Sequence, residues 1–166
     1  INIALMKGSY DNPVMADFVA QLDSVNGVAD ASSGFIWRMQ GDDEVAVATR
    51  IFGEPRMLIN MSVWESIEAL RCFVYHDRHL GVFRDRHRWC EKMNRAHLAL
   101  WWVPIGHVPT VDDGKVCLDR IDAEGPTARA FTFSHLFPPP RSAGGFPYAG
   151  SSRMTGLRQD PGGSRL

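Results

Sequence analysis

Four stretches of the chain have the alternating or β-rich composition that is typical of strands. They are residues 2–6, 34–40, 57–64 and 97–104. In residues 57–64 the odd positions from Met57 to Val63 are apolar and share one predicted face, whereas Asn60 and Ser62 fall on the other. We expect residues 45–51 to form a short strand or part of a long connection, and residues 131–137 to form a short edge segment.

Apolar residues recur at helical spacing in two further stretches. Asp11 or Asn12 is expected to cap the first helix, which has Pro13 in its first turn, where the missing N–H costs nothing. The second helix is expected to begin near Ser66 and to continue, with a kink, to about Met93. The apolar stripe of the first helix consists of Val14, Phe18, Leu22, Val25 and Ala29.

A capping-box pattern predicts the start of a third helix. Thr110 and Asp113 have the spacing at which each side chain bonds the other residue's backbone N–H, and Gly125-Pro126 predicts the helix end. The predicted order is strand, helix, strand, strand, helix, strand and then this added helix. It predicts an α+β fold of the ferredoxin-like class, with one antiparallel sheet and both main helices on a single face. The open face of such a sheet predicts a homodimer that buries it.

Composition indicates one globular domain followed by a tail. The chain has 166 residues, of which 45% are hydrophobic and 22% charged, and these values are typical of a globular domain. Residues 1–137 are expected to form this domain. From residue 138 onward Gly, Ser, Pro and Arg dominate, and this composition predicts a tail without stable structure.

Charge and cysteine content narrow the expected partners and compartment. The net charge of −1 gives no general attraction to nucleic acid, so no nucleic-acid partner is expected. Three cysteines without CxxC spacing favour a reducing compartment. No stretch approaches the roughly 20 apolar residues of a membrane span. We therefore expect a cytoplasmic protein without a membrane association.

The second helix carries the first group of candidate site residues. His79 lies one turn after Tyr75 and one turn before Phe83, on the arc of the helix that is expected to face the core or a cavity. An imidazole there is suited to act as a general base, a hydrogen-bond donor or an axial haem ligand, and the alternative is a core histidine bonded to a backbone carbonyl. Cys72, His76 and His79 match no usual ligand spacing, so no metal is expected.

Polar and aromatic residues on the strands form the second group. Arg38 and Asn60 interrupt apolar strands, so they either contact a ligand in an enclosed cavity or face water. Trp37 and Trp102 are candidates for the wall of such a cavity. Because successive side chains of a strand point to opposite faces, Trp101 and Trp102 are expected on different sides of the sheet. The sequence contains no Gly-rich phosphate loop, GxSxG or HExxH motif, which disfavours nucleotide-driven chemistry and serine hydrolysis.

Three short runs resemble a known family. They are Val-Trp-Glu-Ser at 63–66, Leu-Trp-Trp-Val-Pro at 100–104 and Gly-His-Val-Pro-Thr at 106–110. Together with Phe73, Tyr75, His79 and Trp89, they resemble an uncharacterised bacterial family of the dimeric α+β barrel superfamily, alongside antibiotic-biosynthesis-monooxygenase-like proteins. The resemblance covers residues 2–137. It implies a homodimer whose two sheets face each other around cavities, and it does not specify a reaction.

These residues support three functional hypotheses. The first is a small-molecule enzyme of the monooxygenase-like kind that needs no cofactor and acts on an aromatic or polyketide-like substrate. The second is a haem-binding protein with His79 as axial ligand, and the third is a non-enzymatic binding or stress-response module. In the first hypothesis His79 and Tyr75 are the catalytic residues. The substrate-binding residues are then Arg38, Asn60, Trp37, Trp102 and Phe83.

Overall fold

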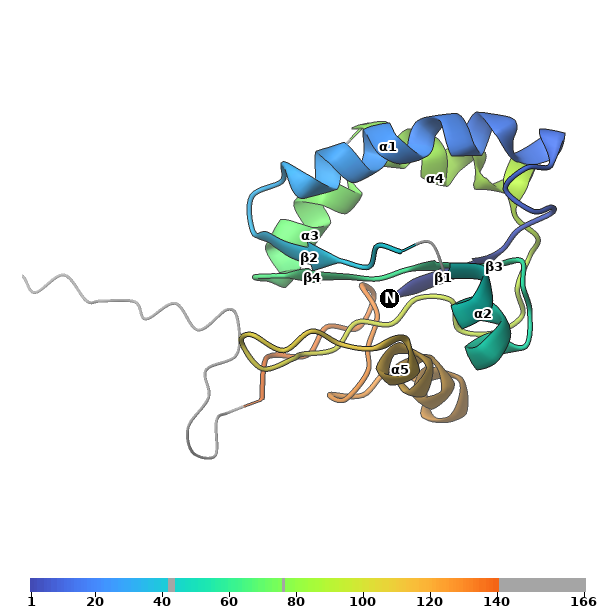
Figure 1. Ribbon diagram of the computed structural model, residues 1–166. Helices are drawn as coiled ribbons and strands as arrows, with labels where there is room; N and C mark the ends of the chain where they lie inside the picture. The colour runs from blue at the N-terminus through green and yellow to red at the C-terminus, as the bar shows by residue number, and fades with distance from the viewer. Residues whose placement is uncertain (42–43, 76, 141–166) are drawn as a thin grey trace, which may run out of the picture.

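A computed structural model of the chain describes residues 1–41, 44–75 and 77–140, without the side chains of residues 44, 77–80 and 83. It is an α+β structure in which helices lie on both sides of a small group of strands (Figure 1). In chain order the elements are β1 (Asn2–Leu5), the 3-10 helix η1 (Pro13–Met15), α1 (Ala16–Asp30), β2 (Phe35–Arg38), α2 (Glu44–Phe52), β3 (Met57–Asn60), β4 (Ser62–Trp64), α3 (Ile67–Val74), α4 (Asp77–Trp89) and α5 (Val111–Glu124).

The strands are joined by two short antiparallel pairings. β1 pairs with β3, with Ile3 opposite Ile59, and β2 pairs with β4, with Arg38 opposite Ser62. β3 and β4 follow each other along the chain and are separated only by Met61. The backbone N–H of Met39 donates to the Met61 carbonyl (2.8 Å), so the two pairings are bonded to each other.

β1 has a second neighbour in residues 97–100. The backbone N–H of Ile3 donates to His97 (2.9 Å), and that of Ala99 donates to Ile1 (3.0 Å). In space the order is therefore residues 97–100, β1, the β3 and β4 stretch, and β2. This order is consistent with the ferredoxin-like plan that the sequence predicts, although regular strand pairing is confined to two-stranded sheets.

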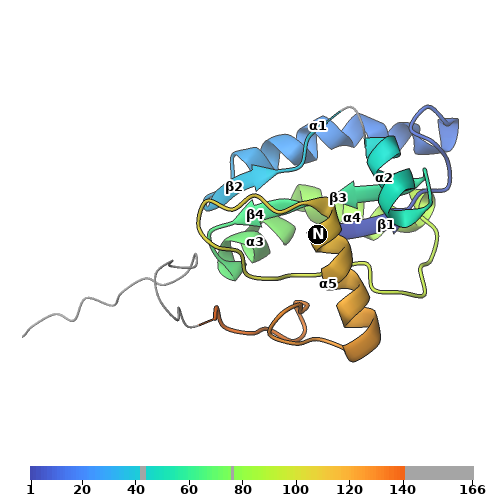
Figure 2. The same ribbon diagram turned by 60° about the horizontal axis from the view of Figure 1, so that its bottom comes forward.

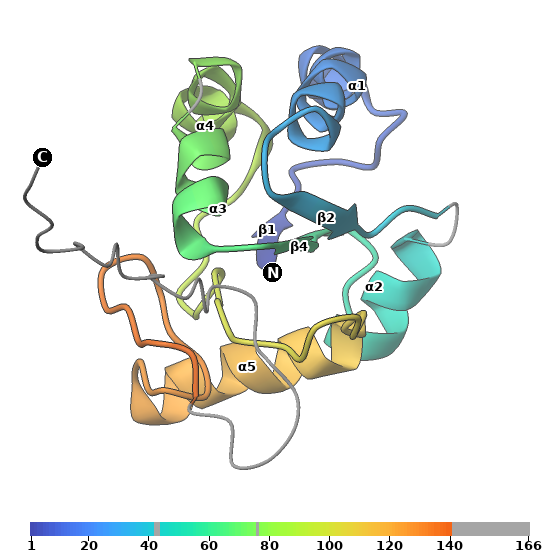
Figure 3. The ribbon, with the colours of Figure 1, turned by 90° about the vertical axis from the view of Figure 1, so that its left-hand side faces the viewer.

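α1, α3 and α4 lie together on one side of the strands (Figure 3). The core on this side is built on Trp89, which is 2% exposed and lies 5.6 Å from the Phe18 ring, centroid to centroid. Asn12 caps η1 through its side chain, and Ser66 caps α3, so both predicted helix starts are confirmed. The predicted second helix is interrupted, however, since α3 ends at Val74 and α4 begins at Asp77.

α2 and α5 cover the other side of the strands, contrary to the predicted sheet with helices on one face only (Figure 3). The larger of the two cores lies here and brings Ile3 and Ile59 from the strands against Ala48 of α2 and Leu118 of α5. The prediction of an open sheet face, on which the homodimer prediction rested, is thus wrong, because the chain covers this face with its own helices.

α2 corrects the prediction of a strand or connection at residues 45–51. Val47 and Ala48 each lie about one turn before Ile51, and all three belong to or pack against the core on the α5 side. The β-branched side chains of Val47 and Ile51 favour extended structure. Burial against the strands overrides that local preference.

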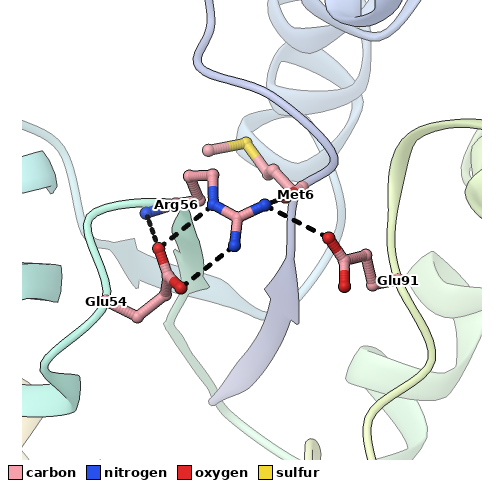
Figure 4. A network of polar contacts seen from close by, with 4 residues as sticks. All are labelled: Met6, Glu54, Arg56 and Glu91. Carbon is pink, nitrogen blue, oxygen red and sulfur yellow. Dashed lines mark hydrogen bonds and ion pairs between the residues drawn. The ribbon is translucent and has the colours of Figure 1, made fainter.

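Arg56 joins three segments near the end of β1 (Figure 4). Its guanidinium donates to Glu54 (3.2 Å), to Glu91 (3.1 Å) and to the Met6 carbonyl (3.3 Å). The Arg56 backbone N–H and guanidinium hold the pKa of Glu54 below its ordinary value of 4.5. This network connects the turn before β3, the end of β1 and the chain that follows α4.

The network predicts a loss of stability in acid. Because the folded-state pKa of Glu54 is depressed, its contribution is present above pH 4.5 and is lost as the pH falls through the lower folded value. The measurement is the free energy of unfolding in urea between pH 7 and pH 3. We expect Glu54→Gln to be less stable than wild type at pH 7 and to lose less stability in acid. Parallel curves for the two proteins would contradict the prediction.

Candidate functional site

A cleft opens between α5 and the segment that precedes it in the chain. Its volume is about 300 Å³, which lies at the lower limit for small-molecule sites. Figure 2 shows residues 101–109 and 125–140, the chain on either side of α5 in sequence, running beside that helix. The residues that line the cleft are Trp101, Trp102, Val103, Pro104, His107, Asp113, Val116, Cys117, Arg120 and Arg129.

The wall supplied by α5 is fixed by the predicted capping box. The Thr110 hydroxyl accepts from the Asp113 backbone N–H (3.2 Å), and the Asp113 carboxylate accepts from the Thr110 backbone N–H (2.8 Å). These bonds satisfy two backbone N–H groups at the start of the helix. Asp119, on the same helix, forms an ion pair with Arg95 (3.2 Å), which ties α5 to the segment after α4.

The two tryptophans supply the aromatic wall. The Trp102 indole N–H donates to the Phe137 carbonyl (2.9 Å), and its ring lies 6.3 Å from that of Phe131. Trp101 is partly buried and packs against the core on the α5 side. Both tryptophans line the cleft, and their placement on different sides of the sheet stays a prediction. That prediction needs a regular strand, and no regular strand continues through residues 101–103.

Two guanidinium groups give the cleft positive charge. Within the described part of the chain, the side chains of Arg120 and Arg129 form neither an ion pair nor a hydrogen bond. Asp113 is the acidic member of the lining, and its hydrogen bonds from the Thr110 backbone and hydroxyl hold its pKa below the usual value. The Oδ2 atom of this carboxylate therefore serves the helix cap, whereas the two guanidinium groups have no hydrogen-bond or ion-pair partner among the described residues.

Cys117 contributes a thiol to the floor of the cleft. Cys117 is 6% exposed, and burial raises the pKa of its thiol above 9.0. The side chain is therefore protonated at neutral pH, and a thiol is a poor nucleophile. Its role in the cleft is that of an apolar, polarizable surface.

Five of the seven predicted site residues have described side chains, and the structure does not bring them together. Arg38 forms an ion pair with Asp30 at the end of α1 (2.8 Å), on the side of α1 and α4. Asn60 is exposed and points away from the core that holds its neighbour Ile59. Trp37 packs against the core on the α5 side, and Tyr75 is 57% exposed. Trp102 is the member of this group that lines the cleft.

The histidine predictions fall outside what the structure describes. His79 and Phe83 lie within α4, but their side chains are not among the described ones, and His76 is outside the described residues. The roles of His79 and Phe83 therefore stay predictions. Among the described residues, no group of three His, Cys, Asp or Glu side chains is arranged to hold a metal ion.

The sequence analysis did not identify Arg120, Arg129 or His107 as site residues. His107 stands in the Gly-His-Val-Pro-Thr run and so had a local signal. Arg120 and Arg129 had none, because the end of α5 separates them in the sequence and only the fold brings them to one cleft. Within the described ranges, no helix combines the length and the apolar composition that crossing a membrane requires.

Comparison with known proteins gives one match. A family model described as "Domain of unknown function (DUF3291)" matches residues 1–144. Neither the curated proteins nor the solved structures include a significant match.

Proposed function

The chain belongs to the DUF3291 family, whose function is unknown, and from the geometry of its cleft we propose that it binds a small aromatic molecule. The observation that carries the proposal is the pair Trp101 and Trp102 on the wall of one cleft. Indole rings offer a large apolar surface on which planar ligands stack. A volume of about 300 Å³ suits a ligand of one or two rings.

The wall is held in place before any ligand arrives. Trp102 is fixed by its bond to the Phe137 carbonyl and by the neighbouring ring of Phe131. A side chain that is already ordered loses little conformational entropy on binding. This preorganisation supports a binding role for the cleft.

We also propose the ferredoxin-like class for the strand arrangement. The support is the spatial order of residues 97–100, β1, β3 with β4, and β2, together with their antiparallel bonds. Homodimerisation and the dimeric α+β barrel stay predictions, and the face that suggested them is covered by α2 and α5. Monooxygenase-like activity and haem binding stay predictions too, because both depend on His79.

Aromatic binding is tested by NMR titration of the ¹⁵N-labelled protein. We expect mono- and bicyclic aromatic fragments to shift the indole N–H signals of Trp101 and Trp102 and the amides of residues 101–107, with dissociation constants on the order of millimolar for fragments of this size. Val116 lines the cleft and is 52% exposed. Val116→Trp is expected to fill the cleft and to abolish these shifts.

Val19→Trp provides the matched control. Val19 is 38% exposed on α1, on the opposite side of the strands, so the same substitution there leaves the cleft open. Fragment shifts that persist in Val116→Trp would place binding elsewhere. A complete lack of shifts at residues 101–107 in the wild-type protein would refute the proposed function.

A further inference from the structure

Two arginines of the cleft have guanidinium groups without a partner in the part of the chain that the structure describes. Arg120 is partly buried on α5, and Arg129 stands on the chain that follows this helix. In contrast, Arg38, Arg56 and Arg95 each form an ion pair with a carboxylate of the chain. Guanidinium groups are suited to bind carboxylates through paired, charge-assisted hydrogen bonds.

The charge of the lining fits an anion with one negative charge. Arg120 and Arg129 supply two positive charges and Asp113 supplies one negative charge. With His107 counted as neutral, the lining carries one net positive charge. One oxygen of Asp113, Oδ2, already accepts from both the backbone N–H and the hydroxyl of Thr110, which weakens the competition of this carboxylate for the guanidinium groups.

Aromatic and charged surfaces therefore meet within one small cleft. Trp101 and Trp102 offer planar apolar surface, and Arg120 and Arg129 offer donors. Resting on the proposed function, we infer that the ligand is an aromatic carboxylate whose ring contacts the tryptophans and whose carboxylate binds the two arginines. This assignment names the chemical class of the ligand. It predicts that the cleft binds a negatively charged ligand more tightly than a neutral ligand of the same shape.

The test compares two ligands of nearly equal shape, cinnamate and cinnamamide. Both are titrated at pH 7.5 into the ¹⁵N-labelled full chain, and dissociation constants are taken from the shifts of residues 101–107. We expect cinnamate to bind about tenfold more tightly, since hydrogen bonds between charged partners are stronger than neutral ones. Raising the salt concentration is expected to weaken cinnamate alone.

Variants assign the charge effect to the two arginines. Arg120→Gln and Arg129→Gln are each expected to weaken cinnamate binding by about three- to tenfold and to leave cinnamamide unchanged. Arg71→Gln is the matched control, because Arg71 is exposed on α3, on the far side of the strands from α5. It is expected to change neither constant.

The outcomes separate this inference from the proposed function. Equal affinities of cinnamate and cinnamamide would overturn the carboxylate assignment and leave aromatic binding intact. Tighter binding of phenyl phosphate than of cinnamate would likewise overturn it, in favour of a dianion. If neither cinnamate nor cinnamamide shifts the signals of residues 101–107 at millimolar concentration, the inference fails together with aromatic binding in this cleft.

Discussion

Replacing Trp89 with Ala is expected to reduce the free energy of unfolding by about 3–5 kcal/mol. The side chain comes from the last residue of α4, is 2% exposed and lies in the core between this helix and α1, where Met6, Met15 and Phe18 surround it. Truncation removes this apolar contact and leaves a cavity that the neighbouring residues fill only in part. The expected loss is a large fraction of the ~5–15 kcal/mol by which a domain is stable. Urea unfolding followed by circular dichroism measures it.

Tyr75 is the control for this substitution. It is an aromatic residue at the end of α3 that is 57% exposed, so Tyr75→Ala removes a ring without opening a cavity. We expect a change within about 0.5 kcal/mol. Similar losses for Trp89→Ala and Tyr75→Ala would show that the side of α1 and α4 is not packed as described.

Leu118→Ala is expected to cost about 2–5 kcal/mol. Leu118 lies on α5, is 0% exposed and belongs to the core that this helix forms with β1 and β3. The substitution tests whether α5 closes the second side of the strands within one chain. The free energy of unfolding and its dependence on protein concentration are the measurements, and no concentration dependence is expected for a core closed within one chain.

Val116→Ala is the companion measurement on the same helix. Val116 is 52% exposed and two positions from Leu118, so its truncation removes little buried surface. We expect the free energy of unfolding to change by about 0.5 kcal/mol or less. If Leu118→Ala were equally mild, α5 would not be an integral part of the core.

Features of the fold that depend on nearby residues could be predicted from the sequence. Thr110 and Asp113 are three positions apart, and the capping box that they form needs no distant partner. The alternation of side chains along the strand that contains Met57 and Ile59 likewise depends on local geometry. Both residues are buried as expected. Local bonding and periodicity therefore fixed the element types correctly at these positions.

Features that depend on distant contacts could not be predicted in this way. Val47 and Ile51 fit a strand equally well by composition, and only packing against the strands favours the helix α2. The cleft is a stronger case, since Trp102 and Arg129 come from different parts of the chain. Trp102 was identified because it is an aromatic residue on a predicted strand that was expected to wall a cavity. Arg129 could not be identified in this way, because the acidic residues that pair with an arginine can lie anywhere in the sequence. Only the folded structure shows which of them are close to it.

The pairing of β1 with residues 97–100 has a consequence for synthesis on the ribosome. The Ile1 backbone nitrogen bonds to the Ala99 carbonyl across 98 positions of sequence. Until that segment has emerged, one edge of β1 lacks its partner, and until α5 has emerged, α2 alone covers its side of the strands. Nascent chains that end before α5 therefore present apolar strand surface that invites aggregation or chaperone capture. Folding of this domain is accordingly a late event in translation, governed by contacts of high sequence separation.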